Sequence, residues 1–70
     1  MSVDPEKISK LIHHWMDHNR AHRDTYLEWK EKLTEEGLPD TVRALEKVAE
    51  LTLEANQELE KAAAELEERR

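Results

Sequence analysis

Three histidines of this chain are spaced by four residues, at His14, His18 and His22, and the fourth, His13, lies beside them. On an α-helix, positions four apart lie on one face with Cβ atoms ~5–6 Å apart. Neutral imidazoles at that separation can bind one divalent transition metal together. The spacing therefore predicts a metal site formed first by His18 and His22, with His14 as a third ligand. His13 points about 100° away from His14 and is expected to lie at the rim or in solvent.

The metal site predicted for these histidines is incomplete within one chain. Two copies of the chain would supply the four nitrogen ligands that Zn²⁺ favours, or part of a larger set for Co²⁺, Ni²⁺ or Cu²⁺. The spacing does not choose among these metals. The alternative is structural: His18 and His22 would be hydrogen-bonded interior residues that fix the helix register, as a single buried asparagine does in coiled coils, and His14 would be solvated. The chain would then be a helical hairpin that associates with itself or with another helix.

Motifs that would support catalysis are missing from the sequence. There is no cysteine nucleophile, no Glu-x-x-His of the di-iron carboxylate bundles, no His-Glu-x-x-His and no glycine-rich phosphate loop. The histidines therefore favour metal binding, storage or sensing. An enzyme that uses them as a general base, or at an open metal position, has the least support.

Helix start and stop signals divide the chain into two long helices. Asp4 is a good N-cap and Pro5 suits the first helical position. No helix breaker follows until Gly37, which is typical of a Schellman stop. Pro39 then opens a second helix that runs without a breaker to the end of the sequence.

These signals predict a single all-α domain, an antiparallel two-helix hairpin over residues 1–70. The helices are expected over about residues 5–36 and 39–69, with the turn at 37–38. So short a turn forces the helices to run antiparallel. A hairpin buries only one face of each helix, so we expect two copies to form a homodimeric four-helix bundle.

Residues at alternating steps of four and three define an apolar stripe in each helix, which predicts the buried faces. In the first helix the stripe runs through Ile8, Ile12, Trp15, Asn19, His22, Tyr26, Trp29 and Leu33. In the second helix it runs through Val42, Leu45, Ala49, Thr52, Asn56, Leu59, Ala63 and Leu66. Both indole rings are expected to anchor the core of the hairpin.

Both stripes become polar at the same height of the hairpin. In an antiparallel pair with the predicted turn, facing residue numbers sum to about 75–76. Asn19 is then level with Asn56, and His22 is level with Thr52. Buried polar groups are costly unless they are satisfied, so this layer is either a hydrogen-bonded network or a ligand site. The match favours an interior site for His18 and His22 over a surface site.

Composition limits the partners and the location of the protein. A chain of 70 residues without cysteine is near the size at which one hydrophobic core is marginal, so oligomerisation or metal binding is an expected reinforcement. The formal net charge of -6 argues against a nucleic-acid partner. No stretch approaches the ~18–20 apolar residues of a transmembrane helix, and no signal peptide is recognised. We expect a cytoplasmic protein without nucleic-acid or membrane partners.

Histidine and aromatic residues form one pattern in the first helix and the turn: His14-Trp15-x-x-His18-Asn19-x-x-His22-x3-Tyr26-x2-Trp29, followed by Gly37-Leu38. This pattern resembles a group of short, uncharacterised bacterial and archaeal helical hairpins that accompany cobalt, nickel or chelatase-type proteins. The resemblance covers about two thirds of the chain. It implies metal handling at His14, His18 and His22, without an activity. The second helix, rich in Ala, Glu, Leu and Lys, would suit any stable helix, natural or engineered.

Overall fold

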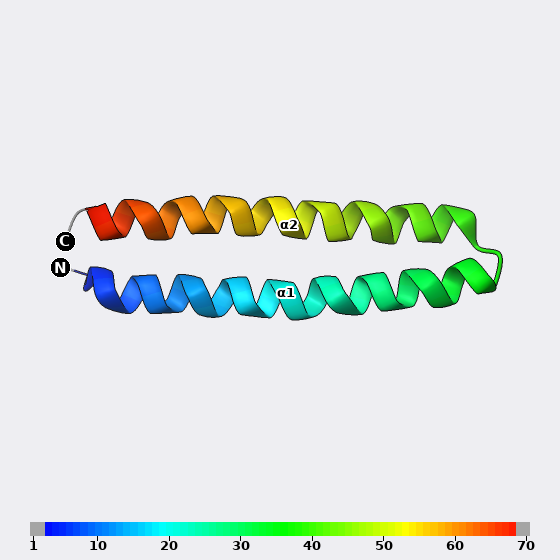
Figure 1. Cartoon of the computed structure of the whole chain (residues 1–70), viewed down its shortest axis with the longest axis horizontal. Helices are drawn as coiled ribbons and strands as arrows, with labels where there is room; N and C mark the ends of the chain where they lie inside the picture. Colours follow the sequence, from blue (N-terminus) through cyan, green and yellow to red (C-terminus); the bar gives the residue numbers. More distant parts are fainter. Residues whose placement is uncertain (1–2, 69–70) are drawn as a thin grey trace.

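Two long helices joined by a tight turn make up the computed structural model, which describes residues 3–68 (Figure 1). Helix α1 spans Pro5–Glu35 and helix α2 spans Pro39–Glu68, and the two run antiparallel. The hairpin is a rod with extents of 52 × 18 × 14 Å. The expected all-α hairpin is confirmed. Position 69, the expected last residue of the second helix, lies outside the described residues.

The start of α1 is fixed by its N-cap. Asp4 has extended backbone angles, and its Oδ1 accepts a hydrogen bond of 3.0 Å from the backbone N–H of Glu6. The carbonyl of Asp4 accepts the first helical hydrogen bond, 3.1 Å from the N–H of Ile8. Pro5 fills the first helical position, where its missing N–H leaves no gap in the ladder. Asp4 therefore provides partners for the N–H groups of Glu6 and Ile8 at the start of α1.

A Schellman turn ends α1 and begins α2. Gly37 has a φ of 71°, in the left-handed region that favours glycine. Its N–H donates to the carbonyl of Thr34 (3.1 Å), and the N–H of Leu38 donates to the carbonyl of Leu33 (3.2 Å). The carbonyl of Leu38 in turn accepts from the N–H of Val42 at 3.0 Å, so the same residue opens α2. The turn therefore connects the last turn of α1 directly to the first turn of α2.

The hydrophobic core is a thin seam between the helices, and it is thickest in the half that contains the chain ends. Its members there are Ile12, Met16 and Ala63, with Ile8, Leu59 and Leu66 around them. Ala49 is buried in the half nearer the turn. No side chain among the described residues is fully removed from water. Each helix covers one face of the other, and two helices alone enclose no interior.

The face that α1 turns toward α2 is rotated relative to the predicted stripe. Met16 is 5% exposed whereas its neighbour Trp15 is 45% exposed, and Trp29 is 50% exposed. Arg23 and Lys30 are half-buried instead. The long alkyl chains of arginine and lysine can cover apolar surface while their charged ends remain in water. The prediction that both indole rings anchor the core of the hairpin is therefore wrong.

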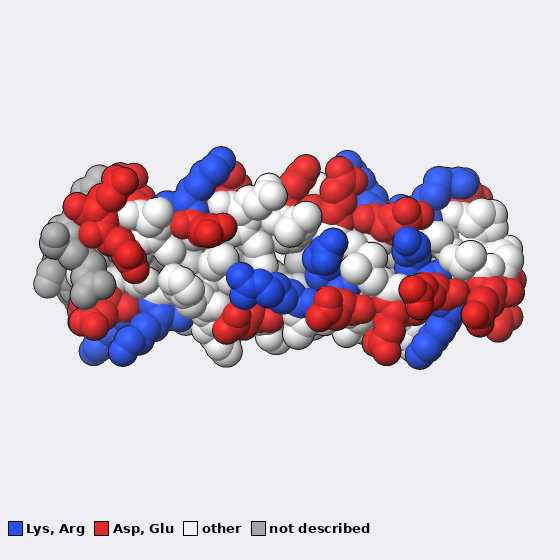
Figure 2. All heavy atoms as spheres, viewed as in Figure 1, with Lys and Arg blue, Asp and Glu red and all other residues white. Residues whose placement is uncertain are grey.

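Charged side chains of both signs are interspersed along the helices on the face shown in Figure 2. The ion pairs join residues three apart on one helix, such as Arg20 with Asp17 (2.7 Å) and Lys61 with Glu58 (2.8 Å). The hydrogen bond to Glu58, together with the charge of that carboxylate, raises the pKa of Lys61. Exposed pairs of this kind add little to stability. Within the described residues, neither helix combines the length and apolarity needed to cross a membrane.

Candidate metal centre

His18 and His22 form a pair on the surface of α1. Their Nε2 atoms are 2.9 Å apart in a hydrogen bond between the rings. The ring centroids are 4.4 Å apart and the ring planes are nearly perpendicular, at 84°. In this bond one nitrogen donates a hydrogen and the other accepts it with its lone pair, and the ring tautomers decide which is which. The structure thus brings together the two histidines that the spacing singled out first.

His14 is less closely associated with this pair. Its ring stacks on that of His18 with centroids 6.4 Å apart and an interplanar angle of 25°. On the other side, Tyr26 stacks on His22 with centroids 6.1 Å apart. Within residues 3–68, no group of three or more His, Cys, Asp or Glu side chains is arranged to hold a metal ion. One chain therefore presents two adjoining imidazole nitrogens, and the roles of His14, His18 and His22 as metal ligands stay predictions.

His13 is exposed and lies apart from the pair, as expected from its direction on the helix. Its Nδ1 donates a hydrogen bond of 2.8 Å to the backbone carbonyl of Ser9. Ser9 is a buried polar residue of α1, with 8% of its surface exposed. His13 is thus anchored to its own helix and makes a natural control for the histidine pair.

Two asparagines make the polar layer between the helices. Asn19 donates from Nδ2 to Oδ1 of Asn56 at 2.9 Å, and Asn56 donates from its own Nδ2 to the carbonyl of Met16 at 3.0 Å. The predicted pairing of Asn19 with Asn56 is confirmed. The predicted interior location of His18 and His22 is wrong, because both are exposed. The layer is completed by amide and carbonyl groups alone, and the histidines lie farther round the helix.

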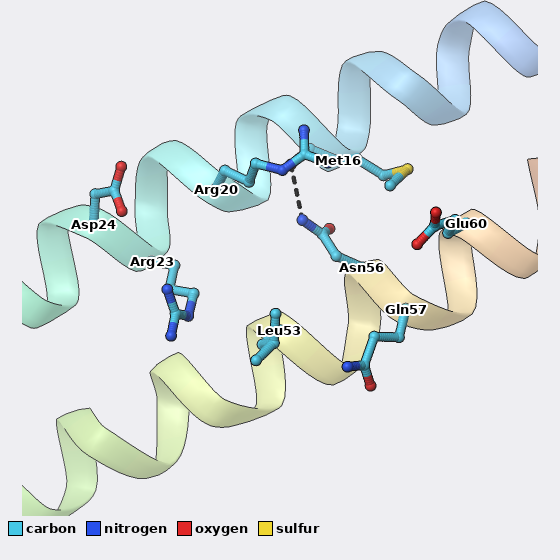
Figure 3. A pocket seen from close by; sticks show the side chains of 8 residues that line it. All are labelled: Met16, Arg20, Arg23, Asp24, Leu53, Asn56, Gln57 and Glu60. Carbon is cyan, nitrogen blue, oxygen red and sulfur yellow. Dashed lines mark hydrogen bonds between the residues drawn. The ribbon is translucent and has the colours of Figure 1, made fainter.

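A groove of about 310 Å³ lies between the helices beside the asparagine layer (Figure 3). Its lining residues are Met16, Arg20, Arg23, Asp24, Leu53, Asn56, Gln57 and Glu60. Two arginines and two carboxylates line it, so it presents no single sign of charge. Nε of Arg23 is the one buried side-chain polar atom that has no hydrogen-bond partner among the described residues. The sequence analysis did not anticipate this groove because it followed the apolar stripes; the spacing of three between Arg20 and Arg23, beside Asn19, was the available signal.

The flank opposite this groove is apolar. Positions 15, 22 and 29 each precede a position that faces α2, which turns them away from the groove-lining Arg20 and Asp24. Helical geometry places Val48 of α2 on the same flank, with Leu51 beyond it. We call this surface the tryptophan face; its exposed members are Leu11, Trp15, His18, His22 and Trp29 of α1 and Val48 and Leu51 of α2. The histidine pair lies in the middle of it.

Comparison with known proteins assigns the chain to a family whose function is unknown. The family described as "Domain of unknown function (DUF8180)" matches residues 8–66, a range that contains the histidine pair, the turn and most of both helices. No curated protein and no solved structure shows significant similarity to the chain. Because the match extends over most of the sequence, the chain belongs to the DUF8180 family of domains of unknown function.

Proposed function

We propose that this protein binds a divalent transition metal through Nε2 of His18 and His22. The observation that carries the proposal is the separation of 2.9 Å between these two atoms. Two nitrogens that each lie ~2.0–2.1 Å from one cation are about 2.9 Å apart at a right angle and about 3.3 Å apart at the tetrahedral angle. A cation could therefore replace the hydrogen between the rings once both exposed side chains rotate so that their Nε2 lone pairs point at it.

The geometry of the pair favours metals that accept ligands at right angles. Octahedral or tetragonal coordination is typical of Co²⁺, Ni²⁺ and Cu²⁺, whereas Zn²⁺ would require the pair to open slightly. The carboxylate of Asp17, the acidic residue beside His18, is already engaged by Arg20 at 2.7 Å. The remaining coordination positions are thus left to water or to another molecule. Binding, storage or sensing of the metal is the role that this exposed pair supports.

Calorimetric titration with Ni²⁺, Co²⁺, Cu²⁺ and Zn²⁺ tests the proposal. His18→Ala and His22→Ala are each expected to weaken binding by roughly tenfold or more. His13→Ala is the matched control and should leave the affinity unchanged, since His13 bonds to its own helix. Protons compete with the metal for imidazole nitrogens, so affinity should fall on acidification. Absence of saturable binding, or binding retained without both histidines of the pair, would contradict the proposal.

His14→Ala decides whether the histidine ladder acts as two ligands or three. A loss of affinity similar to that of His18→Ala would make His14 a third ligand, which requires its ring to leave the stacked position against His18. An unchanged affinity would restrict the ligands to the pair. The result separates the two interpretations without changing the hydrogen bond between His18 and His22.

A second candidate function is a purely structural hairpin that associates through its tryptophan face. The exposure of Trp15 and Trp29, 45% and 50%, favours it. Thermal melting with and without a chelator distinguishes the two candidates, because a metal bound only by the folded state raises stability. If metal-loaded protein stays associated in chelator and its melting temperature does not change, the result would support the structural role alone.

A further inference from the structure

We infer that a second copy of this chain covers the tryptophan face with α1 against α1 in antiparallel orientation, so that both His18–His22 pairs form one four-nitrogen metal site. The metal part of this inference rests on the proposed function. The pairing of the two copies rests on the surface of the hairpin and on the positions of its tryptophans.

The accessible surface of the hairpin is larger than that of a compact monomeric protein of the same mass. It exposes 5607 Å² for a mass of 8.3 kDa. A monomeric protein of that mass exposes ~4,600 Å², so the excess is about 1,000 Å². A specific interface of standard size takes ~800 Å² from each partner. The excess is therefore of the size that one copy loses on forming a stable dimer.

The surplus apolar surface is concentrated on the tryptophan face. Trp15, Trp29 and Leu11 are 45%, 50% and 41% exposed, and they lie on one side of a single helix. Val48 and Leu51 continue this surface on α2, at 39% and 50% exposed. The opposite flank carries the groove with its arginines and carboxylates. A second copy with the same apolar face is thus more complementary to the tryptophan face than to the charged flank that carries the groove.

The tryptophans also fix the orientation of the two copies. Trp15 lies seven residues before His22 and Trp29 lies seven residues after it, which is two helical turns in each direction. A twofold axis near His22 therefore brings Trp15 of each copy toward Trp29 of the other. The histidines of both copies meet in the middle. If α1 packed on α2 of the second copy instead, the two histidine pairs would lie on diagonal helices and could not share a cation.

The chemistry of the pair calls for such a partner. No third His, Cys, Asp or Glu ligand is arranged around His18 and His22 within the described part of one chain. A second pair across the twofold axis raises the nitrogen ligands to four, the number typical of closed zinc sites. The second copy thus completes the site as well as covering the apolar surface.

The orientation is measured first on metal-free protein. The sequence has no cysteine, so Glu36→Cys provides one spin-label site beside the turn. With α1 against α1 and the axis near His22, the two turns lie at opposite ends of the dimer. At ~1.5 Å per residue, the labels should be about 42 Å apart along the rod. With the turns at the same end, the distance would be less than half of that. A short distance, or a monomer at micromolar concentration, overturns the inference.

Sedimentation of surface variants tests which flank is covered. Trp15→Ser and Trp29→Ser should each raise the dimer dissociation constant by at least ~tenfold. Leu53→Ser is the matched control, since Leu53 is 44% exposed but lines the groove on the other flank. It should leave the dissociation constant unchanged. Equal weakening by all three substitutions overturns the assignment of the tryptophan face.

Zn²⁺ titration of the dimer tests the shared site. The expected stoichiometry is one cation for two chains. One cation for each chain overturns the shared site and leaves the proposed function standing. A dimer with distant turns that binds no Zn²⁺, Ni²⁺, Co²⁺ or Cu²⁺ contradicts the proposed function and the shared site, whereas the label distance still establishes the pairing.

Discussion

At the scale of single residues, the contact between Asn19 and Asn56 is the most specific link between the helices. Asn56 is 8% exposed, and its amide both accepts from Asn19 and donates to the carbonyl of Met16. Sliding one helix along the other by a turn would break both bonds and bury unsatisfied amide groups. The pair therefore fixes the register of the hairpin, as polar residues do at interior positions of coiled coils.

Replacing Asn56 with alanine should lower the free energy of unfolding by about 1–3 kcal/mol, because the amide of Asn19 loses its partner in a half-buried place. For a domain of this size that is a fall in melting temperature of roughly 4–8 °C for each kcal/mol. The double variant Asn19→Ala/Asn56→Ala should lose less than the sum of the single variants. Denaturant unfolding of all three variants measures the coupling, and strictly additive losses would show that the amides act independently.

The asparagine contact and the histidine pair were predictable because each depends on spacing alone. Four residues along a helix place His18 beside His22, and the short turn fixes Asn19 opposite Asn56. Burial of the indoles was not predictable in this way. Trp15 and Met16 are adjacent in the sequence and both apolar. Which of the two is covered by α2 depends only on the direction in which α2 lies.

At the scale of the elements, the caps determine where each helix begins and ends. Both helices start at the proline that the sequence indicated, and α1 ends one residue before the predicted position. The facing sides were harder to derive, because α1 carries an apolar arc wider than one neighbouring helix covers. Arg23 and Lys30 lie toward α2 at positions that a hydrophobicity pattern assigns to solvent. Their alkyl chains make that placement possible.

Gly37→Ala should destabilise the hairpin by about 1 kcal/mol, because a residue with a Cβ adopts a positive φ at a cost. The added Cβ would meet no atom within 4 Å, so the loss reflects backbone conformation and not a clash. Gly37→Asn should lose less, since asparagine tolerates the left-handed region better. Thermal unfolding compares these with Glu46→Ala, an exposed helical control. Equal stability of the alanine variant and the parent would mean that the turn changes conformation at no cost.

At the scale of the whole molecule, the hairpin has too little interior to be strongly stable alone. Few of the described apolar residues are buried, and two of these are alanines, Ala49 and Ala63; none of the described side chains is fully enclosed. Chains of this size commonly need a further source of stability, such as association or a bound metal. The tryptophan face and the histidine pair offer both of these at one place on the surface.

The melting temperature should therefore rise with protein concentration, because dimerisation stabilises the folded chain by mass action. Circular dichroism over about a hundredfold range of concentration measures this rise. The variant Trp15→Ser/Trp29→Ser should melt at a lower temperature that does not depend on concentration. A parent protein whose melting temperature is the same at all concentrations would be inconsistent with a stabilising dimer.

The unequal distribution of the core along the rod has a mechanical consequence. The cluster of Ile12, Met16 and Ala63 lies in the half of the rod that contains the chain ends, and the turn closes the other half. Tension applied to the two ends of the chain peels the helices apart starting from that cluster, so it meets the greatest resistance at the outset. Beyond the asparagine layer, the two helices of the remaining half separate progressively toward the turn with little further force.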